Sequence, residues 1–166
     1  PSRFSNTKMF YLRGWRGINI EPDPVKIQDF YIQRPKDTNL NIGIGNKNDM
    51  MKFYKFTPNT LSTFSGKQAE EYLKQGFKLL ETKTIPVQKL ADTLEKHLKK
   101  EEIDFLSIDT EGLDFEVLKS NNWRKFKPKV ICIEERDTEK FLVDIGYTKV
   151  YQTQTNSVFT LINSLV

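Results

Sequence analysis

The sequence predicts an α/β fold, with a mostly parallel sheet covered by helices and an antiparallel hairpin at its C-terminal edge. Strand and helix patterns alternate along the 166 residues. The expected strands 103–109 and 129–135 are nearly continuous in apolar residues, as parallel strands covered on both faces are. Two strand patterns separated by a polar turn near Asn156 close the chain. This order is typical of an α/β sandwich with one antiparallel edge.

Six helices are expected from apolar periodicity and from residues that start or stop a helix. They cover residues 5–13, 24–34, 66–75, 88–99, 113–120 and 137–145. Ser5 or Asn6 is expected to cap the first helix, and Gly14 to stop it. Asp23 is expected to cap the second helix, with Pro24 at its first helical position.

The expected strands occupy the gaps between these helices. They are residues 17–21, 40–45, 50–56, 77–87, 103–109 and 129–135, followed by the two strands of the closing hairpin. The strands 50–56 and 77–87 interrupt the alternation. We expect them to form an insertion, as a hairpin or an edge strand, before the next crossover.

Length and composition favour one soluble domain spanning residues 1–166. The chain is 37% hydrophobic and 29% charged, and no segment approaches the roughly 20 apolar residues of a membrane span. The single cysteine, Cys132, excludes an internal disulfide and favours a cytoplasmic location. It lies in an apolar segment, so we expect it to be a core residue. The opening PSRFSNTK has neither an initiator methionine nor the apolar core of a signal peptide, so we expect the domain to be N-terminally incomplete.

Acidic residues stand at the ends of three of the four strands expected to be parallel. Glu21 ends the first, Asp109 ends the third with Glu111 two residues further on, and Glu134 and Glu135 end the fourth. Ligands of such sheets bind at the carboxyl ends of the strands. These carboxylates therefore predict a ligand that carries hydroxyl groups and a positive charge.

Glu21 is the strongest binding candidate among these acids. Asp23 already supplies the cap of the following helix, so capping does not explain Glu21. A carboxylate can accept hydrogen bonds from both vicinal hydroxyls of a ribose, and dinucleotide-binding folds place an acid after a strand for this purpose. The sequence predicts that Glu21 binds the ribose of a nucleotide-like cofactor.

Asp109 and Glu111 have two interpretations that can hold together. Asp109 or Thr110 can cap the next helix, and Glu111 suits the positive end of that helix. Gly112 lets the backbone approach a ligand closely, which favours a functional role for both carboxylates. No cluster of histidine and cysteine suggests zinc, and no metal ligand is predicted.

Four segments, in their order and spacing, resemble the FkbM-type family of S-adenosylmethionine-dependent methyltransferases. They are GWRGINIEPDP (14–24), NIGIGN (41–46), IDFLSIDTEGLDFEVLKS (103–120) and KPKVICIEE (127–135). The resemblance implies a Rossmann-like class I methyltransferase sheet with S-adenosylmethionine as cofactor. It also implies methyl transfer to a hydroxyl of a saccharide or related natural product.

The resemblance assigns roles by position. Contacts to the cofactor are implied for Glu21, Pro22, Ile44, Gly45, Asn46 and Asp109. Glu21 would bind the ribose, and residues 44–46 would line the adenine. Asp109 and Glu111 would face the methionine end and the acceptor, where either carboxylate is a candidate general base.

The family's first strand and its glycine-containing loop would precede Pro1, so we expect this chain to lack both and to bind S-adenosylmethionine poorly by itself. The absent strand would lie between the strands 17–21 and 103–109. These two strands are therefore expected to pair directly, to take a strand from another chain, or to flank a strand that the given sequence omits. The third arrangement is the favoured one.

Two alternative functions stay open at this point. One is a binding module with the methyltransferase fold but without catalysis, which the missing loop favours. The other is a nucleic-acid methyltransferase, favoured by the net charge of +4 and the basic stretch 119–129. That stretch lacks the interleaved aromatic residues of a base-stacking surface, so the expected partner is a small-molecule or saccharide acceptor. The sequence does not indicate an oligomeric state.

Overall fold

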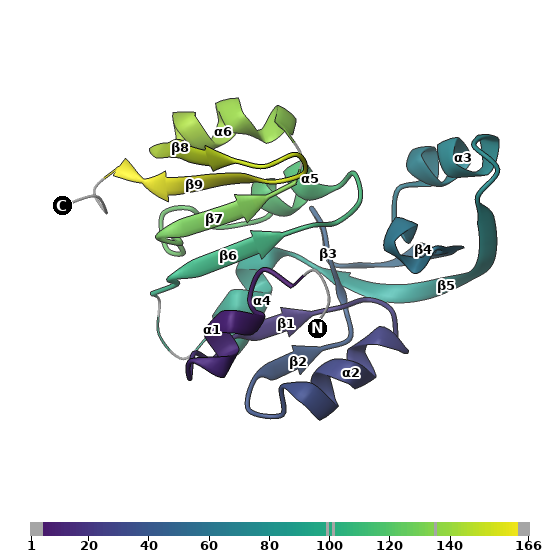
Figure 1. Cartoon of the computed structure of the whole chain (residues 1–166), viewed down its shortest axis with the longest axis horizontal. Coiled ribbons are helices and arrows are strands. Elements are labelled where there is room, and N and C mark those ends of the chain that lie inside the picture. Colours follow the sequence, from purple (N-terminus) through teal and green to yellow (C-terminus); the bar gives the residue numbers. More distant parts are fainter. Residues whose placement is uncertain (1–4, 99, 101, 135, 163–166) are drawn as a thin grey trace.

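The structure, a computed structural model, describes residues 5–98, 100, 102–134 and 136–162, which form a mixed α/β architecture (Figure 1). The α-helices are α1 (Lys8–Leu12), α2 (Lys26–Gln33), α3 (Gly66–Lys74), α4 (Leu90–His97), α5 (Asp114–Lys119) and α6 (Glu139–Asp144). The strands are β1 (Ile18–Ile20), β2 (Thr38–Leu40), β3 (Gly43–Ile44), β4 (Asp49–Thr57), β5 (Lys78–Gln88), β6 (Phe105–Ile108), β7 (Val130–Ile133), β8 (Tyr147–Gln152) and β9 (Ser157–Leu161). Two short 3₁₀ helices are η1 (Asn59–Leu61) and η2 (Arg136–Thr138). None of the described helices has the length and apolar character needed to cross a membrane.

Each of the six expected helical ranges contains a helix, but the first begins later than predicted. Thr7, rather than Ser5 or Asn6, precedes α1 as its N-cap residue. The side chains of the two predicted caps are engaged elsewhere: Ser5 Oγ accepts a hydrogen bond from Arg34, and Asn6 Nδ2 donates to Ser107 Oγ at 3.1 Å. Tertiary contacts therefore displace the expected cap.

The helix α2 also begins later, at Lys26 instead of Pro24. Asp23 nevertheless orders the turn that leads into it. Its Oδ1 atom accepts a hydrogen bond from Val25 N at 2.9 Å, and its carbonyl accepts one from Ile27 N at 3.0 Å. Asp23 thus caps the turn before the helix, two residues earlier than a conventional N-cap.

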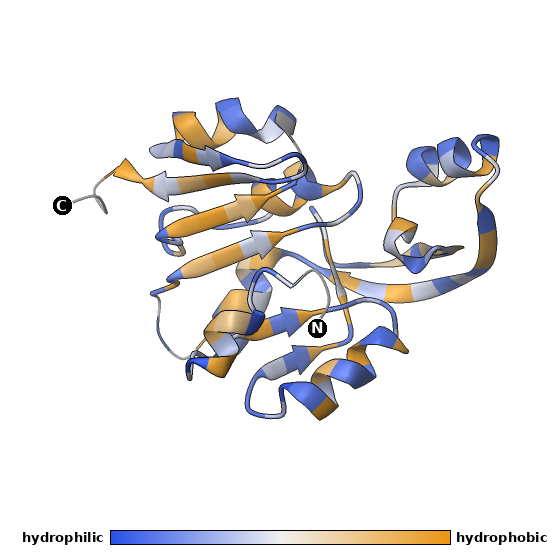
Figure 2. Ribbon diagram, viewed as in Figure 1, coloured by the Kyte–Doolittle hydropathy of each residue, from blue (hydrophilic) through white to orange (hydrophobic). Residues whose placement is uncertain are grey.

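The largest sheet has the strand order β6-β7-β9-β8. β6 and β7 are parallel, whereas β9 is antiparallel to both β7 and β8, which confirms the predicted C-terminal hairpin. Apolar residues concentrate on β6 and β7 (Figure 2). They pack with residues of α4, α5 and α6 to form the main core, and Cys132 is buried as expected.

The segment 40–45, predicted as one strand, is divided between two sheets. β2 pairs in parallel with β1, and β3 pairs in parallel with β5. The side chain of Asn41 explains the interruption, because its Nδ2 atom donates to the carbonyls of Glu21 and Pro22, both at 2.9 Å. This side chain substitutes for strand pairing and redirects the backbone toward β5.

β1 and β6 belong to different sheets in the described part of the chain, so direct pairing, one of the three arrangements considered, does not occur. The segment 5–12, which includes α1, contacts β6 on one side and the residue that follows α2 on the other. Figure 1 shows α1 in this region of the molecule. Asn6 donates to Ser107 on β6, and the ring of Phe10 lies 5.1 Å from that of Phe105 on the same strand. On the other side, this segment is bonded to Arg34, which follows α2.

Residues 49–88 form a projecting structure that we call the arm (Figure 1). β4 and β5 pair as a long antiparallel hairpin, with η1 and α3 between them, which confirms the expected insertion. The arm has its own small core of Phe56, Ala69 and Tyr72. Its two ends meet at Asn48 and Lys89, where Asn48 Oδ1 accepts a hydrogen bond from Lys89 N at 2.8 Å.

Two polar contacts join the arm to the turn that follows β1. Lys55 Nζ lies 3.0 Å from Asp23 Oδ2, in an ion pair whose carboxylate is buried. Lys26 Nζ donates to the carbonyl of Asn59 at 2.7 Å. The arm is therefore fixed to the sheet edge where ligands are expected.

Replacing Arg34 by methionine is expected to lower the free energy of unfolding by ~1–3 kcal/mol, because three polar groups lose a partner. The buried guanidinium donates to Ser5 Oγ at 2.8 Å, to Thr7 Oγ1 at 2.7 Å and to Asn19 Oδ1 at 3.3 Å. Urea denaturation measures the change. Arg13→Met, at an exposed position, is the control, and an equal loss in both variants would contradict the assigned role of Arg34.

Candidate active site

A cavity of about 870 Å³ lies at the ends of β1 and β6, against the arm. It is within the size range of small-molecule and cofactor sites. Five of the residues predicted from the sequence line it, namely Glu21, Pro22, Ile44, Asp109 and Glu111. Segments distant in sequence therefore meet at one site, as expected for the carboxyl ends of parallel strands.

Glu21 presents one carboxylate oxygen to this cavity without a protein partner. Its Oε1 atom accepts a hydrogen bond from Asp23 N at 2.8 Å, whereas Oε2 has no hydrogen-bond partner among the described residues. Burial raises the pKa of Glu21, and the hydrogen bond from Asp23 together with the charge of Lys26 opposes that rise. Oε2 is thus the atom available to accept a hydrogen bond from a ligand.

Of the three residues expected to line an adenine, only Ile44 lies on the cavity. Gly45 is buried, and its N–H donates to the carbonyl of Gln88 at 3.0 Å. Asn46 is exposed and donates through Nδ2 to Glu116 Oε2 at 2.7 Å. Gly45 and Asn46 therefore hold the end of β3 against β5 and α5.

The arm supplies an aromatic part of the lining that sequence reasoning did not assign. The rings of Phe53 and Phe64 are 4.9 Å apart, and both residues line the large cavity. Gly43 permits this packing, because a Cβ atom there would lie 2.6 Å from the ring of Phe64. A glycine within a strand often marks such a close approach, and this signal was available in the sequence.

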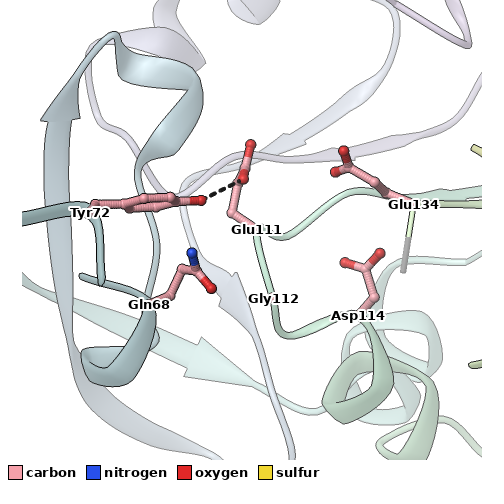
Figure 3. A pocket seen from close by; sticks show the side chains of 6 residues that line it. All are labelled: Gln68, Tyr72, Glu111, Gly112, Asp114 and Glu134. Atoms are coloured by element: carbon pink, nitrogen blue, oxygen red, sulfur yellow. Dashed lines mark hydrogen bonds between the residues drawn. The ribbon is translucent and has the colours of Figure 1, made fainter. Parts of the chain in front are cut away.

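A second cavity, of about 210 Å³, lies between α3 and the turn after β6 (Figure 3). It is lined by Gln68, Tyr72, Glu111, Gly112, Asp114 and Glu134. Glu111 lines both cavities, so the two spaces adjoin at this residue. Gln68, Tyr72 and Glu134 were not predicted as site residues, although Glu134 was recognised as an acid at a strand end.

Glu111 has a left-handed backbone, with φ of +51°, and Gly112 follows with φ of +90°. This conformation costs a non-glycine residue ~1–2 kcal/mol. Two hydrogen bonds from the arm hold it: Thr63 Oγ1 donates to the carbonyl of Glu111, and Tyr72 Oη donates to Glu111 Oε2, both at 3.0 Å. The arm thus sets both the backbone and the carboxylate of Glu111.

Asp109 does not cap the helix that follows it, and neither does Thr110. Leu113 is the N-cap residue of α5, and no side chain caps it. Instead, the buried Asp114 accepts hydrogen bonds from the N–H of Thr110, at 2.8 Å, and from its hydroxyl. The capping expectation is wrong, and the side chain of Asp109 faces the large cavity instead.

Asp109, Glu111 and Glu134 each place a carboxylate oxygen within 4.8 Å of the others. Burial is the main cause that raises the pKa of Glu111, and the hydrogen bond from Tyr72 opposes it. Burial, a hydrogen bond with Asp109 and the neighbouring negative charges raise the pKa of Glu134 to about 8. Exposed acids often gather without a cation, so this proximity by itself defines no metal ligand.

An α/β architecture with a cavity at strand ends is typical of α/β proteins that bind small ligands. The comparison with known families is more specific: residues 1–159 match the family model described as Methyltransferase FkbM domain. The chain therefore belongs to this methyltransferase family, which confirms the resemblance found in the sequence. Comparisons with curated proteins and with solved structures give no match.

Replacing Glu134 by glutamine is expected to stabilise the fold near pH 8 and to change little near pH 4.5. The pKa of Glu134 is raised in the fold, so the folded protein retains a proton that the unfolded chain releases. The wild type therefore loses stability relative to the variant as the pH rises from about 4.5 to about 8. Urea denaturation across this range measures the difference. The control is Glu70→Gln, at an exposed position on α3, and a pH-independent effect of Glu134→Gln would contradict the prediction.

Proposed function

We propose that this domain is an S-adenosylmethionine-dependent O-methyltransferase that acts on a hydroxyl of a saccharide or related natural product. Membership of the methyltransferase family supports the reaction class. The observation that carries the mechanism is the position of Glu111 on both cavities, because methyl transfer requires adjoining donor and acceptor sites. We further infer that the sheets β1-β2 and β6-β7-β9-β8 are parts of a Rossmann-like class I methyltransferase sheet.

The large cavity would bind the cofactor. Glu21 Oε2 would accept hydrogen bonds from the ribose hydroxyls, and Ile44 would contact the adenine beside Pro22. Asp109 would face the methionine end, where its negative charge complements a sulfonium. When bound, S-adenosylmethionine supplies a methyl group already activated for transfer.

The protein's main tasks would then be alignment, exclusion of water and removal of one proton. A hydroxyl acceptor must lose its proton as it attacks the methyl carbon, and a nearby carboxylate can accept it. We assign this role to Asp109, which receives a hydrogen bond from protonated Glu134. Glu111, on both cavities, would orient the acceptor oxygen and is the second candidate base.

Glu21→Ala is expected to weaken binding of S-adenosylhomocysteine by ~1–3 kcal/mol, because the ribose hydroxyls lose their acceptor. Isothermal titration calorimetry on the full-length protein measures the dissociation constant. Glu70→Ala, exposed on α3, is the matched control. An unchanged dissociation constant for folded Glu21→Ala would remove the ribose assignment, and absence of binding by the wild type would remove the proposed cofactor.

Asp109→Asn is expected to lower turnover ~10²–10⁴-fold, the usual cost of losing a general base, while cofactor affinity changes far less. The assay follows transfer of a labelled methyl group from S-adenosylmethionine to saccharide acceptors. Calorimetry on the same variant separates binding from chemistry. If affinity collapses while the bound complex still turns over, Asp109 is a cofactor ligand and Glu111 becomes the base.

A further inference from the structure

The smaller cavity is built from two separate parts of the molecule. Gln68 and Tyr72, four residues apart, lie on one face of α3 and line the cavity from the arm (Figure 3). Glu111 and Asp114 belong to the turn after β6 and the start of α5, while Glu134 follows β7. The arm therefore closes one side of a space whose other side is formed by the sheet edge.

The chemistry of this lining suits hydroxyl groups and disfavours anions. Three of the lining residues carry carboxyl groups, and none of the described residues that line the cavity is cationic. Carboxylate oxygens accept hydrogen bonds from hydroxyls, and the amide of Gln68 can both donate and accept. A carboxylate, sulfate or phosphate on the ligand would lie beside these acidic side chains, and no described lining residue offers it a cation.

The cavity also has the right position for an acceptor. Glu111 separates it from the large cavity and contributes to the lining of both. An oxygen bound beside Glu111 would therefore lie next to the methyl donor. The alignment depends on the hydrogen bonds from Thr63 and Tyr72, which fix the turn at Glu111.

We propose that this smaller cavity is the acceptor subsite, that it selects a saccharide without acidic groups, and that Tyr72 is the residue that positions Glu111. The proposal rests on the proposed function and adds the location and the charge selectivity of the acceptor site. Gln68 and Tyr72 make the arm the element that determines acceptor specificity.

The role of Tyr72 has a signature that a purely structural role would lack. Among the described residues, the charged or titratable groups around Glu111 are Tyr72 on α3, Lys26 on α2, Asp109 after β6, Asp114 on α5 and Glu134 after β7. The hydroxyl of Tyr72 donates to the Glu111 carboxylate and thereby lowers its pKa. Tyr72→Phe keeps the ring in the arm core but removes this donor.

The first experiment measures the Glu111 carboxyl titration by NMR in Tyr72→Phe. We expect its pKa to shift upward while the dissociation constant of S-adenosylhomocysteine is unchanged. Tyr151→Phe, at an exposed tyrosine on β8, should leave the titration unaltered. An unshifted Glu111 pKa in folded Tyr72→Phe would overturn the positioning role.

The second experiment uses saturation-transfer NMR to measure binding of methyl β-glucoside and of glucuronate, in the presence of saturating S-adenosylhomocysteine. We expect saturation transfer to the neutral sugar only. Gln68→Ala should bind this sugar roughly tenfold more weakly, equivalent to one lost hydrogen bond. Gln75→Ala, just after the same helix, should bind like the wild type. Equal transfer to both sugars, or to neither, would overturn the acceptor subsite.

The proposed function and the proposed acceptor subsite are contradicted by different results. If S-adenosylhomocysteine does not bind the wild type, the proposed function fails. If it binds normally, but Gln68→Ala and Gln75→Ala bind methyl β-glucoside equally well, only the acceptor assignment fails.

Discussion

The left-handed turn at Glu111 is the constraint on which both cavities depend. A glutamate does not adopt this conformation cheaply, and it persists here because Thr63 and Tyr72 bond to its backbone and its carboxylate. Both partners belong to the arm, so a structure outside the main sheets determines the geometry at a sheet edge. The small arm core around Tyr72 keeps that donor in place. Packing in the arm core thus determines how the side chain of Glu111 is oriented at the sheet edge.

The same edge concentrates negative charge that the fold only partly compensates. Asp109, Glu111 and Glu134 lie close together. Burial and a hydrogen bond with Asp109 raise the pKa of Glu134, and Tyr72 donates a hydrogen bond to Glu111. An arrangement selected only for stability would disperse such charges or pair them with cations. The proposed site, for a positively charged donor and a hydroxyl acceptor, would account for keeping them together.

The acids could be predicted from the sequence because their positions require only that the ends of the strands be recognised. Glu21, Asp109 and Glu111 follow recognisable strands, and parallel packing brings such ends together. The role of Tyr72 was not visible, because its bond to Glu111 joins residues 39 positions apart and depends on how the arm folds back. The interruption of segment 40–45 was missed for a related reason.

In that segment, the apolar pattern continues while the side chain of Asn41 replaces the backbone pairing. The apolar pattern shows which residues are apolar. It cannot show which of two sheets each half of segment 40–45 joins. The same limit applies to Gly45 and Asn46, whose neighbours Gln88 and Glu116 are distant in sequence. Local patterns therefore predicted the elements and the acids, whereas the contacts between elements decided their roles.

The joined ends of the arm have a consequence for how related domains can diverge. Since Asn48 and Lys89 meet at the base, the residues that connect β4 to β5 can change in length or sequence without moving the strands outside the arm. Such variation is nevertheless not free. A different arm would still need groups that bond to Glu111, as Thr63 and Tyr72 do here, and a cation that pairs with buried Asp23, as Lys55 does. Diversification of this region should therefore conserve a few anchoring groups while the surface between them varies, which would change the proposed acceptor site and leave the turn at Glu111 unchanged.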